Sequence, residues 1–206
     1  MTKAVLFDLD GTIIDSNEAI FKTYQEVARQ IDNPIPSDDD VRKLLGQPSQ
    51  YNLNHLFGDH PKARDVYNKV VKITHENLQP LPNARKTLMD IKLPKGIVTS
   101  KRSDNAKEIL GDLIELFDVI VTPEQTTLQK PNPEPIYLAC EKLHVSSSET
   151  VYVGDTTREY QTALNAGTGF IGLAHKGSSH SDFESMGLTT IAHSFEEIVE
   201  LLEALQ

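Results

Sequence analysis

Two aspartates, Asp8 and Asp10, stand directly after a short apolar run near the start of the chain. The run, Ala4–Phe7, is typical of a fully buried strand. Because side chains alternate along a strand, both carboxylates would leave it from the same face. Two acids at the end of a buried strand are costly unless they bind a cation or take part in a reaction. The alternative is an ordinary turn at Asp10-Gly11, capped by Asp8.

Strand-like runs recur along the chain, and helical patterns separate them. The predicted strands are residues 4–7, 96–99, 119–122, 151–153 and 169–173, and the predicted helices are residues 83–91, 103–113, 134–143, 159–166 and 194–205. This alternation predicts an α/β fold with a Rossmann-like, mostly parallel sheet and helices on both faces. Ligands of such sheets bind beyond the carboxyl ends of the strands, so polar residues that follow the strands should meet at that edge.

One segment, residues 16–80, interrupts this alternation and contains no convincing strand. Its helical patterns cover residues 17–31, 37–45, 48–57 and 61–78. We therefore expect two domains, a catalytic core from residues 1–15 and 81–206 and an inserted all-helical cap from residues 16–80. The alternative is an ordinary helical subdomain that only adds apolar core, but its place directly after the first strand favours a lid.

Four short motifs resemble those of the haloacid dehalogenase-like hydrolases, and they occur in the order of that family. They are Asp8-Leu9-Asp10-Gly11-Thr12, Gly96-Ile-Val-Thr99-Ser100, Lys130-Pro-Asn-Pro-Glu-Pro135 and Val151-Tyr-Val-Gly154-Asp155-Thr-Thr-Arg-Glu159. The resemblance covers nearly the whole chain and is nearest to the phosphoglycolate-phosphatase-like branch. It implies a Rossmann-like core with an inserted helical cap.

The resemblance also assigns catalytic roles. Asp8 would be the nucleophile that forms an aspartyl-phosphate. Asp10 would be the general acid and base, and we expect neighbouring acids and burial to raise its pKa toward neutrality. Thr99 would donate to a phosphoryl oxygen, and Lys130 would neutralise the nucleophile and the transferring group. The dehalogenases of the family lack the second aspartate, so Asp10 favours phosphoryl transfer.

The cofactor that the resemblance implies is Mg²⁺. Its ligands would be the carboxylates of Asp8 and Asp155, the backbone carbonyl of Asp10, and Glu159. The family more often has aspartate at the position of Glu159, so contact through a water molecule is as good an interpretation as direct contact. Alternative roles are a helix N-cap for Asp155 and a solvated helix face for Glu159.

Substrate binding is expected from two places in the chain. Backbone N–H groups near Gly11 and Ser100 would donate to the phosphoryl group. Arg42 and Lys43 belong to a cap segment ending at Pro48 that resembles the phosphoglycolate phosphatases, and they would bind a carboxylate on the leaving group.

Composition narrows the range of partners. The chain has 206 residues, with 20 Lys plus Arg against 30 Asp plus Glu and a net charge of −10, which argues against a nucleic-acid-binding protein. Cys140 is the single cysteine, so no internal disulfide is possible, and we expect a reducing compartment. The Cys140 side chain should be buried and inert. We expect no signal peptide and no membrane span, and therefore a cytoplasmic monomer or homodimer.

The expected function is a Mg²⁺-dependent phosphatase that hydrolyses a small phosphorylated metabolite, a phosphomonoester similar to phosphoglycolate. A sugar-phosphate mutase or a pyrophosphatase of the same family is the alternative within this chemistry. A phospho-acceptor signalling module would also use acids, Mg²⁺, a hydroxyl and a lysine. A built-in acid and base, Asp10, together with the large helical insert, argues for turnover instead.

Overall fold

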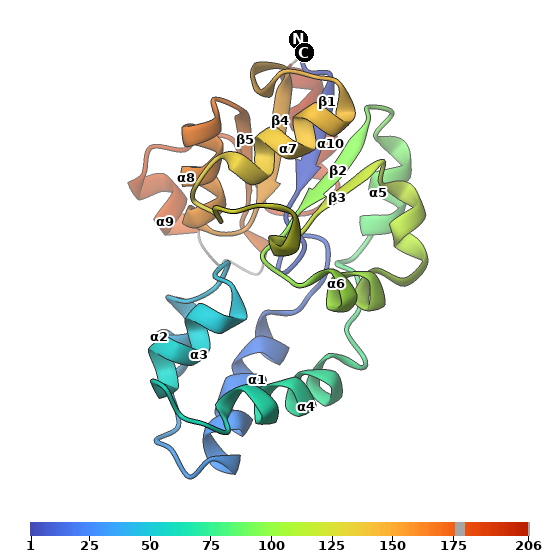
Figure 1. Cartoon of the computed structure of the whole chain (residues 1–206). Helices are drawn as coiled ribbons and strands as arrows, with labels where there is room; N and C mark the ends of the chain where they lie inside the picture. Colours follow the sequence, from blue (N-terminus) through green and yellow to red (C-terminus); the bar gives the residue numbers. More distant parts are fainter. Residues whose placement is uncertain (176–179, 206) are drawn as a thin grey trace.

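The computed structural model describes residues 1–175 and 180–205, and a parallel sheet of six strands forms its centre (Figure 1). The strands are β1 (Ala4–Phe7), β2 (Lys95–Val98), β3 (Val119–Val121), β4 (Thr150–Gly154), β5 (Gly169–Leu173) and β6 (Ile191–Ala192). Their order is β3-β2-β1-β4-β5-β6, and every neighbouring pair is parallel. The first strand therefore lies between β2 and β4, and the motifs that follow these three strands are neighbours.

Helices cover both faces of the sheet. Val5 and Phe7 face one side and Leu6 faces the other, because side chains alternate along β1. The side of Val5 is covered by α5 (Ala84–Asp90), α6 (Ser103–Leu110) and α10 (Glu197–Ala204). The side of Leu6 is covered by α7 (Glu134–Leu143), α8 (Thr157–Ala166) and α9 (His180–Ser185). This arrangement confirms the predicted α/β, Rossmann-like fold class.

The insert over residues 16–80 consists of helices, as expected. They are α1 (Asn17–Gln30), α2 (Asp38–Arg42), α3 (Ser49–Phe57) and α4 (Ala63–His75). In Figure 1 they lie below the sheet, beyond the carboxyl end of β1. An apolar cluster of their own includes Tyr24, Val27, Leu53, Phe57 and Val70. This separate core supports our proposal that residues 16–80 form a cap.

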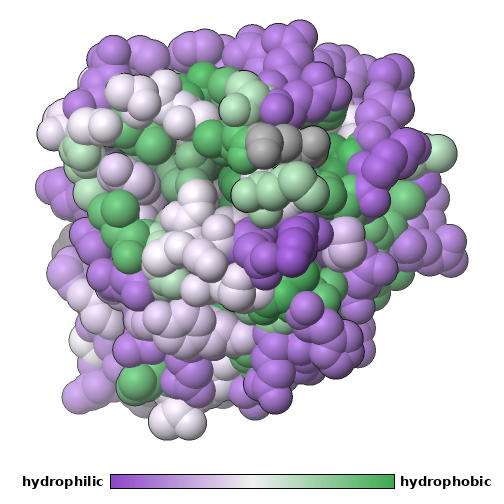
Figure 2. Space-filling model, turned by 90° about the horizontal axis from the view of Figure 1, so that it is seen from above, coloured by the Kyte–Doolittle hydropathy of each residue, from purple (hydrophilic) through white to green (hydrophobic). Residues whose placement is uncertain are grey.

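The end of the molecule opposite the insert carries both termini. Figure 2 shows this end as a mostly hydrophilic surface in which hydrophobic residues occur in smaller groups. Within residues 1–175 and 180–205, none of the helices is long and apolar enough to cross a membrane. Cys140 is buried as expected, and burial raises the pKa of its thiol.

Several boundaries differ from the sequence prediction. Neither α9 nor β6 was predicted, because each is short and has no clear periodicity. The helix predicted over residues 37–45 ends at Arg42, and a turn follows in which Gly46 has φ +77°. The helix predicted over 103–113 ends at Leu110, since Gly111 has φ +51° and begins a 3₁₀ helix. The last helix begins at Glu197, whose amide donates to Ser194.

Candidate active site

The motif residues meet where three neighbouring strands end. Asp8 follows β1, Thr99 follows β2 and Asp155 follows β4. The amide of Asp8 donates to the carbonyl of Val153 over 2.9 Å, which fixes the first aspartate against β4. All three side chains are buried. The edge predicted from the alternation of strands and helices is therefore the place where these residues gather.

Asp8 is a nearly fully buried carboxylate with a lysine as its partner. Its Oδ1 atom accepts a hydrogen bond from Lys130 Nζ over 2.8 Å, and 3 % of the residue is exposed. Burial raises the pKa of Asp8 to about 7, Lys130 opposes this shift, and Glu159 and Asp10 add to it. One ammonium group is thus insufficient to stabilise the charge of Asp8 in this surrounding.

Lys130 has more partners than the sequence predicted. Its Nζ atom donates to Asp8, to Glu159 Oε1 over 2.7 Å and to the Tyr152 hydroxyl over 3.2 Å, so all three protons are used. The Tyr152 hydroxyl donates its own hydrogen bond to the carbonyl of Val98 over 3.0 Å. Burial alone would lower the pKa of Lys130, but Asp8 and Glu159 raise it well above its ordinary value. The lysine is a fixed positive charge between two carboxylates.

Three buried carboxylates lie close enough to share a metal ion. Asp8, Asp155 and Glu159 each offer an oxygen within 4.8 Å of the other two. Asp155 accepts hydrogen bonds from Thr12 over 3.2 Å and from Asn17 over 3.4 Å. Burial, together with Glu159 and Asp8, still raises the pKa of Asp155 well above its ordinary value. Three acids against one ammonium leave an excess of negative charge, and such oxygen donors suit Mg²⁺.

Gly11 makes room for this cluster. A Cβ atom at this position would lie 2.1 Å from Asp155 Oδ2, and the backbone φ is +74°. The Gly11 amide donates to the Ile14 carbonyl over 2.9 Å and to Ser16 Oγ over 3.2 Å. Gly11 therefore serves the site by its missing side chain, while its N–H group is engaged within its own turn.

Glu159 belongs to the acidic cluster but uses both of its oxygens. Oε1 accepts from Lys130, and Oε2 accepts from the Thr156 hydroxyl. The residue is completely buried, so it is not on a solvated helix face. In this geometry Glu159 orients Lys130, which favours a contact with a metal ion through water over a direct one.

The pKa of Asp10 is shifted in the opposite direction from the one predicted. Burial alone would raise its pKa, but Lys101, 3.1 Å from Oδ2, and a hydrogen bond with Ser16 outweigh burial and lower the pKa below its ordinary value. The expectation of a raised pKa is wrong because it did not include Lys101, whose proximity no local pattern indicates. Asp10 Oδ1 is buried and has no hydrogen-bond partner within the described residues.

Thr99 and Ser100 have different surroundings. Thr99 Oγ1 accepts from the Lys101 amide over 3.1 Å and keeps its own proton for another partner. Ser100 Oγ donates to the Gly46 carbonyl of the insert over 2.7 Å. The side chain of Ser100 therefore joins the core to the insert. In the described part of the chain the amides of Leu9 and Asp10 have no acceptor, which leaves them for an anion.

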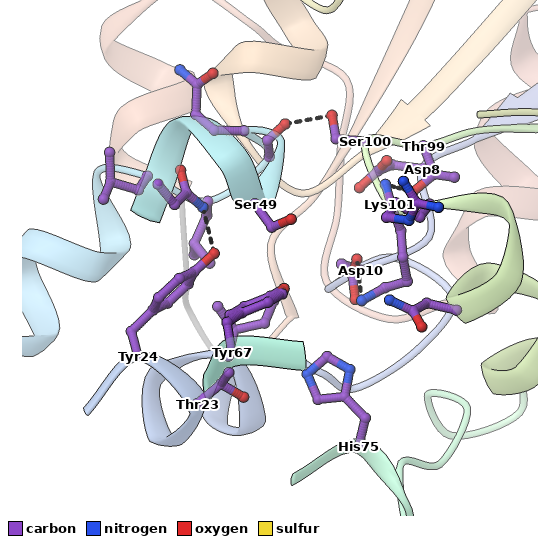
Figure 3. A pocket seen from close by; sticks show the side chains of 18 residues that line it. Asp8, Asp10, Thr23, Tyr24, Ser49, Tyr67, His75, Thr99, Ser100 and Lys101 are labelled. Carbon is purple, nitrogen blue, oxygen red and sulfur yellow. Dashed lines mark hydrogen bonds and ion pairs between the residues drawn. The ribbon is translucent and has the colours of Figure 1, made fainter. Parts of the chain in front are cut away.

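Two of the cavities between the core and the insert are lined by predicted site residues. The smaller one measures about 60 Å³, and Asp8, Asp10, Thr99 and Ser100 line it from the core (Figure 3). The larger one measures about 860 Å³, and its lining includes Gly11, Asp155, Arg42, Lys43 and Arg158. Leu45 and Gln47 line both cavities, so their loop forms the wall between them.

Arg42 and Lys43 share the larger cavity with Gly11 and Asp155 and are thus separated from Asp8, Asp10, Thr99 and Ser100. Neither lines the cavity of Asp8 and Asp10. The Arg42 guanidinium lies 5.6 Å from the centre of the Phe21 ring and 3.9 Å from Asp39. The structure brings Asp8, Asp10, Thr99 and Ser100 to one cavity and leaves the two cations at the neighbouring one.

His75 is a cavity residue that sequence reasoning missed. It comes from the last turn of α4 and lines the smaller cavity together with Asp10. Both ring nitrogens are buried without a partner in the described residues. Burial and Lys101 lower the pKa of His75 to about 4, so the ring is neutral at pH 7. Only its place at the end of a predicted helix could have drawn attention to it.

The comparisons with known proteins agree with this geometry. The profile of the family described as haloacid dehalogenase-like hydrolase matches residues 5–173. The pyrophosphatase PpaX of Bacillus velezensis is 32 % identical over 183 residues, which cover 83 % of this chain and 82 % of that protein. The N-acetylmuramic acid 6-phosphate phosphatase of Pseudomonas aeruginosa is 28 % identical over 178 residues, 81 % of this chain and 79 % of that one.

Solved structures show the same fold over nearly the whole chain. A predicted phosphatase from Clostridium acetobutylicum is 25 % identical and superimposes with a TM-score of 0.84, covering 98 % of this chain and 99 % of that one. A hydrolase from Pseudomonas syringae, 20 % identical, reaches a TM-score of 0.86 over 98 % of this chain and 99 % of that one. The chain therefore belongs to the haloacid dehalogenase-like hydrolases.

Proposed function

We propose that the protein is a Mg²⁺-dependent phosphatase that hydrolyses a small phosphomonoester through an aspartyl-phosphate on Asp8. The observation that carries this proposal is the position of Asp8, buried beside Lys130 and open to a cavity that Asp10 also lines. The activities named for the two relatives, a pyrophosphatase and a sugar-phosphate phosphatase, support hydrolysis of a phosphoryl group.

Asp8 and Asp155 would hold Mg²⁺, with the backbone carbonyl of Asp10, as their burial and excess negative charge favour. When bound, the ion supplies the positive charge that allows a phosphate dianion to approach the Asp8 carboxylate. Glu159 keeps Lys130 in place beside Asp8. The lysine then neutralises the nucleophile and the incoming phosphoryl group.

The first step is attack of an Asp8 carboxylate oxygen on phosphorus, while the bond from phosphorus to the leaving alcohol breaks. Thr99 and the amides of Leu9 and Asp10 donate to the phosphoryl oxygens. These groups are fixed by β1 and β2 and need no rearrangement, which is the property that electrostatic catalysis requires.

Asp10 transfers the protons of both steps. Lys101 favours its carboxylate in the free protein, whereas a phosphate dianion beside it opposes Lys101 and raises the pKa of Asp10. Asp10 can then give a proton to the leaving alkoxide. In the second step its carboxylate takes a proton from the water that attacks the aspartyl-phosphate.

Pyrophosphate is the second candidate substrate. It is favoured by the name of the Bacillus velezensis relative. The expectation of a substrate similar to phosphoglycolate rested on Arg42 and Lys43 as ligands of its carboxylate. These two residues line the larger cavity, away from Asp10. The proposal here is therefore a small phosphomonoester without that restriction.

The covalent step can be tested by trapping. The protein is mixed with Mg²⁺ and a ³²P-labelled phosphomonoester, quenched in acid within milliseconds, and the protein-bound label is counted. We expect label that hydroxylamine releases, as an acyl phosphate requires, and none in Asp8→Asn. Asp8→Asn should also lower kcat by at least ~10³-fold, because an amide is a far poorer nucleophile. Asp65→Asn, on an exposed position of α4, is the matched control. Full activity of Asp8→Asn would exclude the mechanism.

A further inference from the structure

We propose that the smaller cavity binds an uncharged, hydroxyl-bearing leaving group, and that Asn52 and His75 of the insert are the side chains that bind it. The substrate would then be a small polyol phosphate. This inference rests on the proposed function, because it places the leaving group beside the general acid, Asp10.

The position of Asp10 decides which cavity holds the leaving group. A general acid must lie within hydrogen-bond reach of the oxygen that it protonates. Asp10 lines the smaller cavity and does not line the larger one. Figure 3 shows Asp10 and Lys101 on one side of this space and Tyr24, Tyr67 and His75 of the insert across from them.

The wall of the insert has polar atoms without partners. Asn52 is 4 % exposed, and its Nδ2 atom donates to the Tyr24 hydroxyl over 3.0 Å. The ring of Tyr24 stacks on that of Tyr67, with 5.7 Å between the ring centres. Asn52 Oδ1 and both nitrogens of His75 are buried and have no partner within the described residues. Buried polar atoms are rarely left unpaired, so we infer that a ligand forms hydrogen bonds with these three atoms.

The unpartnered atoms suit a hydroxyl group better than an anion. Asn52 Oδ1 can only accept a hydrogen bond, and a neutral imidazole offers one donor and one acceptor. A hydroxyl both donates and accepts, so it satisfies either residue. A carboxylate or a second phosphate brings no proton for Asn52 Oδ1 and lies close to the carboxylate of Asp10.

The charges around the cavity agree with this choice. Among its described lining residues, none that comes from the insert is an arginine or a lysine. The lining cations of the core are already paired, Lys101 with Asp10, and Arg102 with Asp104 and Glu124. Arg64 of the insert hydrogen-bonds Ser49 and Gln50 and is not a lining residue. An anionic leaving group would therefore meet no unpaired cation of the insert.

The size of the cavity limits the leaving group. Its volume is about 60 Å³, enough for a few water-sized groups, so a three-carbon polyol fits this space better than a hexose. Glycerol 3-phosphate is the appropriate probe. In 3-phosphoglycerate a carboxylate replaces one hydroxymethyl group, and nothing else changes, so the two esters form a matched pair.

The first experiment measures phosphate release by the wild-type protein with Mg²⁺. We expect kcat/KM to be at least ten-fold higher for glycerol 3-phosphate than for 3-phosphoglycerate or pyrophosphate. A higher kcat/KM for either of the two anionic leaving groups would overturn the inference.

The second experiment compares variants on glycerol 3-phosphate and on p-nitrophenyl phosphate, whose leaving group has no hydroxyl hydrogens to donate to Asn52. Asn52→Leu and His75→Leu should each lower kcat/KM for glycerol 3-phosphate about ten-fold more than for the aryl ester, because each leaves a substrate hydroxyl without a partner. His75→Gln should restore part of the loss, since an amide also donates and accepts. Asn54→Leu, an exposed position of the same helix, is the control and should change neither value.

The outcomes separate this inference from the proposed function. Equal losses on both esters, with unchanged thermal unfolding, would show that Asn52 and His75 do not contact the leaving group. Phosphate release that depends on Asp8 would leave the phosphatase proposal standing in that case. If no ester released phosphate while Asn54→Leu and the wild type were equally folded, the proposed function itself would fail.

Discussion

The catalytic edge of the sheet and the wall of the insert that faces it are built on opposite principles. At the sheet, Asp8, Lys130 and Glu159 form a chain of buried charges in which every proton of the lysine has an acceptor. On the insert, Asn52 and His75 are neutral and leave polar atoms without partners. The hydrogen bonds of Lys130 are complete without a ligand, whereas the polar atoms of Asn52 and His75 would be completed by the leaving group that we propose.

Under the proposed function, this difference follows from the part of the substrate that each side binds. The phosphoryl group is common to all substrates of such an enzyme, so the groups that bind it can be fixed in advance by β1 and β2. The leaving group varies, and discrimination among alcohols comes from hydrogen bonds that only the correct one completes. The comparison predicts that changes at the sheet lower turnover of every substrate, and that changes on the insert alter the choice among substrates.

Among the changes that test this comparison, the largest effect is expected from removing the ammonium group of Lys130. Lys130→Met removes the ammonium and leaves Asp8 and Glu159 as two buried carboxylates without their shared cation. We expect kcat/KM to fall by about 10²–10³-fold on every phosphomonoester. Lys142→Met, on α7, is the control. A loss confined to one substrate would show that Lys130 reads the leaving group, and the contrast between sheet and insert would be wrong.

Metal binding tests the division of roles within the acidic cluster. Asp155→Ala should weaken Mg²⁺ binding by about ten-fold or more, measured by calorimetric titration, because it removes a carboxylate that has no cation as a partner. Glu159→Gln should weaken it less and should lower kcat, since Glu159 orients Lys130. EDTA should abolish activity and Mg²⁺ should restore it. A stronger loss of Mg²⁺ affinity in Glu159→Gln would make Glu159 a direct ligand.

The excess negative charge at the sheet should also appear as a dependence of stability on pH. The pKa of Asp8 is raised from 3.8 to about 7 in the metal-free protein, so this group contributes stability that is present below pH 3.8 and is lost as pH rises toward 7. The free energy of unfolding of the wild type should therefore fall, relative to that of Asp8→Asn, by up to ~1.4 kcal/mol per pH unit over this range. Urea unfolding of both proteins with EDTA between pH 4 and pH 8 measures it.

Added Mg²⁺ provides the control for the pH experiment. The ion binds the charged carboxylates of the native state, so it should remove most of the pH dependence of the wild type and little of that of the variant. A difference that stays constant between pH 4 and pH 8 would show that Asp8 is ionised throughout, with Lys130 alone sufficient to stabilise it.

The sequence was sufficient for the fold class and for bringing most of the candidate site residues to one edge of the sheet. Apolar runs in the sequence indicate the strands. Residues directly after neighbouring parallel strands lie at the same edge of the sheet, so Asp8, Thr99 and Asp155 could be placed together. The contact of Lys101 with Asp10 could not be predicted, because it depends on the turn after β2 and not on a spacing.

The insert was harder to predict for a related reason. Asn52 and His75 come from two helices of the insert, and no periodic pattern says which of their polar residues turn toward the core. The boundary of α2 decided the position of Arg42: the helix ends there, and the following turn brings Leu45, Gly46 and Gln47 against the core instead. The sequence indicated that Arg42 and Lys43 belong to a motif, but it did not indicate which cavity they line.

The smallest effect is expected at Arg42, and it sharpens the comparison most directly. Arg42→Ala removes a cation that stacks over Phe21 beside the larger cavity, away from Asp10. The ratio of kcat/KM between phosphoglycolate and p-nitrophenyl phosphate should therefore change less than about three-fold, since a lost contact to a charged leaving group would change it ten-fold or more. Lys43→Ala should behave in the same way, and both ratios come from released phosphate at limiting substrate. A ten-fold loss specific to phosphoglycolate would mean that the leaving group reaches past Leu45 and Gln47 into the larger cavity. Arg42 and Lys43 of the insert would then select the substrate by its charge, and Asn52 and His75 would not.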